Sequence, residues 1–149
     1  MAGDDMNLLR LRQINCGKQE RSTALISRWY KHTDITCVQE PNAGQLRTLR
    51  KVGKLYTCET HKLPRAAIFI HNNIDATKLL KHCNRDLTSI LLEKQKTVIA
   101  SIYLDKNYPV WPSSLDQLVT YCRRKNFKLL MGLDANAHSS TWGNKYNDN

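Results

Sequence analysis

Oxygen-bearing side chains stand at the ends of three strand-like segments that lie far apart in the sequence. Asn15 ends the first segment, Glu40 directly follows the second, and Asp134 and Asn136 follow the third. Carboxylate and amide oxygens are hard ligands of the kind that Mg²⁺ or Mn²⁺ prefers. If the segments are neighbouring parallel strands, their carboxyl ends bring these groups together. The pattern therefore indicates a divalent-metal site assembled from distant parts of the chain.

Each of these residues also has an ordinary structural explanation. Glu40 can cap a helix or face solvent, and Asn136 can form an Asx-turn. Tyr103, inside the segment TVIASIYL, can be a packed aromatic rather than a catalytic phenol. His138 can be a simple loop residue. The residue types alone leave these alternatives open.

The charge balance indicates a polyanionic partner. The 149 residues include 23 Lys and Arg against 13 Asp and Glu, for a net charge of +10. Such a surplus favours nucleic acid or an anionic membrane surface. No apolar run approaches the roughly 20 residues of a spanning helix, and the acidic segment MAGDDMN lacks the apolar core of a signal peptide. We therefore expect an intracellular protein that acts on a phosphodiester and has no membrane partner.

The five cysteines do not form a recognisable framework. They are odd in number and scattered, and no CxxC pair is present. This usage is typical of reduced, intracellular thiols rather than of disulfides or a zinc site.

The elements that position the first two strand ends follow from hydrophobic patterning. Residues 8–15 alternate as in a strand, residues 18–32 have helical spacing, and residues 35–39 form a short apolar strand. Pro41 lacks an N–H group and ends that strand at Glu40. This is a β–α–β unit, whose two strands are parallel.

The rest of the chain adds strands and one helix. Apolar strands are expected at 65–71, 87–93 and 97–104, with a hairpin turn at 94–97. A helix is expected to begin at an N-cap formed by Ser113 or Ser114. Its apolar face consists of Leu115, Leu118, Val119 and Cys122. A last strand, NFKLLMGLD, runs into a loop at Asp134. The pattern predicts one α/β domain with a mixed sheet.

Taken together, the motifs make a more specific pattern. In order, the chain contains RQIN, DITCVQEP, PRAAIFI, ASIYL and LDANAHSSTWGN. In this order and spacing they resemble the endonuclease/exonuclease/phosphatase superfamily, and in particular the endonuclease domain of non-LTR retrotransposons. The DANAH…WG string and the RAAI strand carry the likeness to that branch. The resemblance extends from about Leu8 to Asn149. The resemblance implies a four-layer α/β sandwich of two packed mixed sheets flanked by helices. This chain, residues 1–149, would be its incomplete N-terminal portion, with residues 1–7 as a disordered tail.

The resemblance also implies roles for the strand-end residues. Glu40 would be the principal ligand of Mg²⁺ or Mn²⁺, with Asn15 beside it. Tyr103 would donate a hydrogen bond to the scissile phosphate. Asp134 would orient or deprotonate the attacking water, or protonate the leaving oxygen, and Asn136 would hold phosphate oxygens.

Other positions match the family less specifically. Arg65 would contact a phosphate, His138 would contact DNA or orient a neighbour, and Trp142 would pack. Gly17 stands where apurinic-site enzymes of the superfamily have an Asp. Two groups of basic residues are further candidates for DNA contact or for a solvated face. They are Arg47, Arg50, Lys51, Lys54, Lys62 and Arg65, and Arg123, Arg124, Lys125 and Lys128.

The function implied is that of a metal-dependent DNA endonuclease of retrotransposon origin, which nicks target DNA to leave a 3'-hydroxyl primer. We expect it to act in the nucleus beside a reverse transcriptase domain of the same polyprotein, without a small-molecule cofactor. The family places an essential His with a partnering Asp late in a longer domain, after the point where this sequence ends at NKYNDN. We therefore expect a truncated, weakly active or inactive fragment. The alternatives are a non-catalytic DNA-binding remnant and a phosphatase of the same superfamily.

Overall fold

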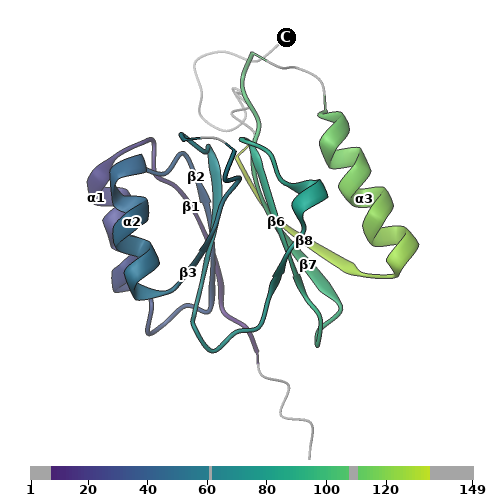
Figure 1. Ribbon diagram of the computed structural model, residues 1–149, viewed down its shortest axis with the longest axis horizontal. Helices are drawn as coiled ribbons and strands as arrows, with labels where there is room; N and C mark the ends of the chain where they lie inside the picture. Colours follow the sequence, from purple (N-terminus) through teal and green to yellow (C-terminus); the bar gives the residue numbers. More distant parts are fainter. Residues whose placement is uncertain (1–7, 61, 108–110, 135–149) are drawn as a thin grey trace, which may run out of the picture.

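The computed structural model describes residues 8–60, 62–107 and 111–134, which are arranged in four layers (Figure 1). Helices α1 (Glu20–Arg28) and α2 (Ala43–Val52) cover the outer face of one four-stranded sheet. A second four-stranded sheet packs against its inner face, and α3 (Ser113–Lys125) covers the far side. This confirms the α/β sandwich of two mixed sheets flanked by helices that the family resemblance implied, whereas the single mixed sheet expected from patterning is wrong.

The first sheet has the strand order β1-β2-β4-β3. Its strands are β1 (Leu11–Asn15), β2 (Ile35–Gln39), β3 (Lys54–Tyr56) and β4 (Ala66–Ile70). β1 and β2 are parallel, with Asn15 opposite Gln39, as the β–α–β pattern predicted. β4 is antiparallel to both β2 and β3. The parallel pair therefore presents its two carboxyl ends at the same edge.

The second sheet has the order β5-β6-β7-β8. Its strands are β5 (Thr77–Lys78), β6 (Leu87–Leu92), β7 (Thr97–Tyr103) and β8 (Lys128–Asp134), with a short 3-10 helix η1 (Leu80–His82) after β5. β6 and β7 form the predicted hairpin, and α3 is the crossover that makes β8 parallel to β7. The register of this pair places Tyr103 opposite Asp134.

Some elements differ from the sequence-based expectation. Patterning missed α2 and β3, although α2 has a visible start signal: the side chain of Asn42 accepts a hydrogen bond from the Gln45 N–H at 3.2 Å. α1 is shorter than predicted because Lys18, with φ +61°, cannot be helical. The predicted serine N-cap of α3 is wrong, since Pro112 occupies that position and Ser113 is already helical.

The layer between the sheets is almost entirely aliphatic. Its buried side chains are Ile35, Cys37, Ile68, Ile70, Ile90, Leu92 and Ile99. Separate clusters lie under α3 and under the α1–α2 layer, so the central strands are buried on both faces. This is why β2, β4 and most of β7 are buried residue after residue and do not alternate between apolar and charged side chains. In the part of the chain that the structure describes, no helix is long and apolar enough to span a bilayer.

Gly132 allows β8 to approach β2 closely across this layer. A Cβ atom at position 132 would overlap the Cβ of Cys37 and lie 3.0 Å from its Sγ. Because the obstacle is the stem of a fully buried side chain, a rotamer change cannot relieve it. Gly132 thus sets the separation of the sheets two residues before Asp134.

We predict that Gly132→Ala destabilises the fold by about 1–3 kcal/mol, as expected for overpacking a dense interior. The measurement is the free energy of unfolding from urea titration. Gly44→Ala on α2 is the matched control, because its Cβ would meet only the Asn42 side-chain oxygen at 3.2 Å. Equal destabilisation by the two substitutions would contradict the close-approach role of Gly132.

Candidate active site

Four of the predicted site residues lie where parallel strands end. Asn15 ends β1 and Asp134 ends β8, and the Asn15 Nδ2 donates a hydrogen bond to the Asp134 Oδ2 across the two sheets. Tyr103 lies beside Asp134 in the register of β7 and β8. Glu40 directly follows β2, whose last residue, Gln39, pairs with Asn15. Residues separated by more than 100 positions in the sequence are therefore assembled at one edge of the sandwich.

A buried carboxamide holds the two sheets in register directly below this edge. Gln39 is fully buried, and its Nε2 donates to the Ser101 Oγ and to the Gly132 carbonyl, each at 3.0 Å. Its Oε1 accepts from the Gln13 Nε2 at 3.2 Å. The Ser101 hydroxyl in turn donates to the Val38 carbonyl at 2.9 Å. These bonds join β1 and β2 of one sheet to β7 and β8 of the other.

The backbone at Glu40 is in an unusual conformation. Its φ is +48°, in the left-handed region that non-glycine residues seldom occupy, and a proline follows it. Two hydrogen bonds hold it there: its N–H donates to the Arg65 carbonyl at 2.8 Å, and its carbonyl accepts from the Lys18 N–H at 2.7 Å. Strain of this kind concentrates at ligand sites, where the surrounding structure imposes it. Here it turns the chain sharply at the residue that carries the carboxylate.

Asn15 orients Asp134. The Asn15 Oδ1 accepts from the Gly17 N–H at 2.7 Å, which fixes the direction of the amide. Its NH₂ group then faces the Asp134 carboxylate. Because the amide oxygen has two lone pairs, this contact leaves one for a further ligand.

The donor set suits Mg²⁺ or Mn²⁺. Glu40 and Asp134 offer carboxylate oxygens and Asn15 offers an amide oxygen, which are hard ligands. Among the described residues, no group of three or more His, Cys, Asp or Glu could hold a metal ion. Mg²⁺ is commonly held by one or two carboxylates, with waters and substrate phosphates completing its shell. Glu40 would hold such an ion, with Asn15 beside it.

Tyr103 is placed to donate a hydrogen bond rather than to act as a base. Burial raises the pKa of its hydroxyl, and the carboxylates of Glu40, Asp105 and Asp134 raise it further, while Arg65 opposes them. The phenol is therefore protonated at neutral pH. Its ring lies under the Arg65 guanidinium, with 4.7 Å between the Arg65 Cζ and the ring centroid.

The guanidinium of Arg65, expected to contact phosphate, is engaged by two carboxylates. Its Nε and Nη2 donate to the two oxygens of Asp86 at 2.6 and 2.7 Å, and its Nη1 donates to Asp105 at 2.7 Å. Sequence reasoning missed both acidic partners. The available signal was their position, since Asp86 immediately precedes β6 and Asp105 follows β7 by two residues.

A small basic groove adjoins Glu40. Its volume is about 270 Å³, and its lining includes Lys18 and Arg85, which are both exposed. Neither cation belongs to the two basic groups predicted from the sequence, although Arg65 of the first group also lines this groove. The Lys54 Nζ donates to the Ile74 carbonyl at 2.8 Å, and Arg123 to Lys125 form the last turn of α3, next to the start of β8 and away from Asp134.

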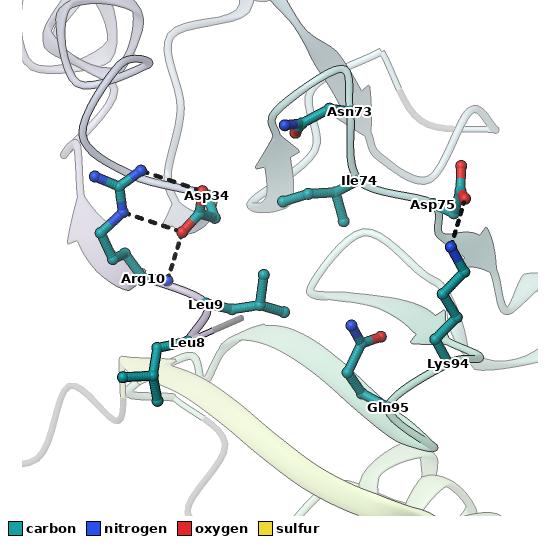
Figure 2. A pocket seen from close by; sticks show the side chains of 9 residues that line it. All are labelled: Leu8, Leu9, Arg10, Asp34, Asn73, Ile74, Asp75, Lys94 and Gln95. Carbon is teal, nitrogen blue, oxygen red and sulfur yellow. Dashed lines mark hydrogen bonds and ion pairs between the residues drawn. The ribbon is translucent and has the colours of Figure 1, made fainter. Parts of the chain in front are cut away.

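A larger cavity, of about 490 Å³, lies at the opposite end of the strands (Figure 2). Its lining contains the Arg10–Asp34 pair, joined at 3.1 Å, and the Lys94–Asp75 pair, joined at 3.8 Å. Its charges are therefore paired with one another. We place the candidate site at the carboxyl ends of the strands and not in this cavity.

Several predicted positions fall outside the described residues. They are Asn136, His138, Trp142 and the expected tail at residues 1–7.

The fold defines the class of protein to which the chain is similar. Among solved structures, it matches the endonuclease domain of TRAS1, a telomere-specific non-LTR retrotransposon, with a TM-score of 0.71 and 21% identity over 95% of this chain. The chain spans 65% of the length of that structure. No family model and no curated protein matches the sequence. The chain thus has the fold of a retrotransposon endonuclease domain, which confirms the resemblance of the motifs at the level of the fold.

We predict that Gln39→Glu destabilises the protein and makes its stability depend on pH. The new carboxylate would face the Gly132 carbonyl, and burial would raise its pKa above the value of about 4.3 in the unfolded chain. The folded state then binds the extra proton, so stability falls as pH rises above that value. Urea titration should show a loss of about 1–3 kcal/mol at pH 5 and a larger loss at pH 8.

Gln95→Glu is the control for this change, because Gln95 is exposed in the β6–β7 turn. If Gln39→Glu were as stable as this control at pH 8, the carboxamide network would not hold the sheets together.

Proposed function

We propose that this chain is part of a metal-dependent DNA endonuclease domain of retrotransposon origin. The observation that carries the proposal is the hydrogen bond from Asn15 to Asp134, which closes the strand-end cluster around Glu40 and Tyr103. The same cluster stands on a fold shared with the TRAS1 endonuclease domain. The reaction is hydrolysis of a phosphodiester bond in target DNA that leaves a 3'-hydroxyl primer.

Each of the described site residues has a separate role in this reaction. Glu40 would hold the divalent ion, which when bound would supply Lewis-acid stabilisation of charge on the phosphate. Tyr103 donates its phenolic proton in a hydrogen bond to a phosphate oxygen, where charge builds up in the transition state. Asp134, oriented by Asn15, takes the proton of the attacking water or orients that water. Asn136 and His138 keep their predicted roles in holding phosphate oxygens and contacting DNA.

DNA binding is proposed for the groove beside Glu40. Lys18 and Arg85 line it, Lys18 from the loop after β1 and Arg85 from the residues before β6. Two exposed cations at the rim of an acidic centre suit a phosphate backbone that passes over a metal site. The net charge of +10 supports the same partner.

We further propose that the protein acts in the nucleus with a reverse transcriptase domain of the same polyprotein. These associations stay predictions.

The first test is nicking of supercoiled plasmid in the presence of Mg²⁺. We expect nicking that EDTA abolishes. Glu40→Gln should lower its rate by about 10²-fold or more, since the metal ion would lose its carboxylate ligand. Glu93→Gln, in the exposed β6–β7 turn, should have no effect. Nicking that survives Glu40→Gln would contradict the assignment of the site.

A wild-type chain that binds DNA without nicking it would instead support the non-catalytic DNA-binding alternative. Hydrolysis of small phosphate monoesters without plasmid nicking would support the phosphatase alternative.

The second test concerns the groove. Each phosphate contact that is lost should reduce the slope of log affinity against log salt by about 0.9 for duplex DNA. We expect this reduction for both Lys18→Ala and Arg85→Ala in fluorescence-anisotropy titrations of a DNA duplex. Lys125→Ala, at the far end of α3, is the matched control. If all three variants change the slope equally, binding is diffuse and the groove is not its centre.

A further inference from the structure

Arg65 joins the two sheets at the edge where the site lies. It immediately precedes β4 in the first sheet, and its carbonyl accepts from the Glu40 N–H at 2.8 Å. Its side chain extends to Asp86 and Asp105, which flank β6 and β7 of the second sheet. The Tyr103 N–H donates to the Asp86 carbonyl at 2.9 Å. Arg65 and Tyr103 are thus attached to the same carboxylate residue, one by side chain and the other by backbone.

The charges around the guanidinium make it a poor phosphate ligand. Asp86 forms a bidentate ion pair with Arg65, and Asp105 accepts a hydrogen bond from a third N–H group of the guanidinium. The Asn107 N–H and the Arg65 guanidinium hold the pKa of Asp105 below its usual range, so this carboxylate is charged at neutral pH. One cation and two anions leave the trio with a net negative charge. Three of the five N–H donors are used by these carboxylates, and a phosphate that approached the remaining two would do so against that charge.

The same arrangement fixes the plane of the guanidinium over the Tyr103 ring. Three N–H···O bonds to two carboxylates leave the planar group little freedom to rotate. The ring centroid lies 4.7 Å from the Arg65 Cζ, within the range of a cation–π contact. Because a swing of the side chain about χ1 or a twist of the ring about χ2 would weaken this contact, it favours one position of the phenolic oxygen and one ring plane, in which the O–H bond prefers to lie. Correct orientation of a hydrogen-bond donor accounts for a large part of the rate acceleration that it provides.

We propose that Arg65 is a positioning residue, held by Asp86 and Asp105, that orients the Tyr103 phenol toward the substrate phosphate and does not itself bind phosphate. The effect of Arg65 on catalysis rests on the proposed function. The orientation of Tyr103 and the lack of a phosphate contact are properties of the protein that can be measured whether or not it nicks DNA.

Arg65→Lys is the decisive variant, because it keeps the positive charge and removes the planar, forked donor. In the full chain labelled with 3-fluorotyrosine, the ¹⁹F resonance of Tyr103 is identified by its disappearance in Tyr103→Phe. We expect this resonance to shift and broaden in Arg65→Lys. Arg10→Lys is the matched control, since Arg10 forms a similar fork with Asp34 at the opposite end of the strands. An unchanged Tyr103 resonance in Arg65→Lys would overturn the proposal.

The salt dependence of DNA affinity separates positioning from phosphate binding. If Arg65 acts through Tyr103, Arg65→Met leaves the slope of log affinity against log salt unchanged. A direct phosphate contact instead predicts a reduction of about 0.9. A reduction equal to that of Arg85→Ala would overturn the proposal. Should Arg65→Met fail to fold, as judged by circular dichroism, Asp105→Asn provides a second variant, and its Tyr103 resonance should move in the same direction as in Arg65→Lys.

Kinetics add a third readout where nicking is measurable. We expect Arg65→Lys to lower kcat about 10-fold or more at nearly constant KM, because only the orientation of a donor is lost. Combined with Tyr103→Phe, it should cause no further loss, since the two residues act as one unit. Additive losses would overturn the proposal. Absence of nicking in the wild type would refute only the proposed function, while the resonance and the salt slope would still decide the role of Arg65.

Discussion

The carboxamide of Gln39 is the interaction on which the geometry of the rest depends. It lies in a layer otherwise filled by aliphatic side chains, where an unpaired amide would cost about 1–3 kcal/mol. Its donors and its acceptor are all engaged, and the partners come from β1, β7 and β8. Few relative placements of the two sheets satisfy all of them. Side chains repeat every two residues along a strand, so this register continues from Gln13 to Asn15 and from Gly132 to Asp134. The meeting of Asn15 and Asp134 is the consequence.

Charge is distributed unevenly around that meeting point. Glu40, Asp86, Asp105 and Asp134 gather at the strand ends, with the Arg65 guanidinium held by two of them. The chain as a whole carries a charge of +10. An acidic centre favours a cation because each added carboxylate repels the others, whereas a basic surrounding favours a polyanion. A site that binds a divalent ion and a nucleic acid together needs both conditions, and this contrast supports the proposed function.

Much of the architecture was predictable because it follows from local pattern. Buried strands, the β–α–β unit and the β6–β7 hairpin were read from apolar runs and turn residues, and the strand-end argument selected Asn15, Glu40 and Asp134. The helix α2 was missed although Asn42 marks its start, because its ten residues bury only Leu46 and Leu49 and the apolar signal is weak. The partners of Arg65 could not be read at all. They lie 21 and 40 positions away, and nothing local to Arg65 distinguishes a carboxylate partner from a phosphate.

The sequence by itself thus determined which residues end the strands and which chemical groups they carry, since strand ends and residue types are local properties. Only the tertiary structure decided which of these groups touch. The contact between Asn15 and Asp134 depends on the packing of two sheets, which Gln39 and the missing side chain of Gly132 control. The engagement of Arg65 by Asp86 and Asp105 depends on the same packing. Side-chain contacts between two packed sheets depend on how one sheet is placed on the other and on the distance between them. The local sequence pattern determines neither of these.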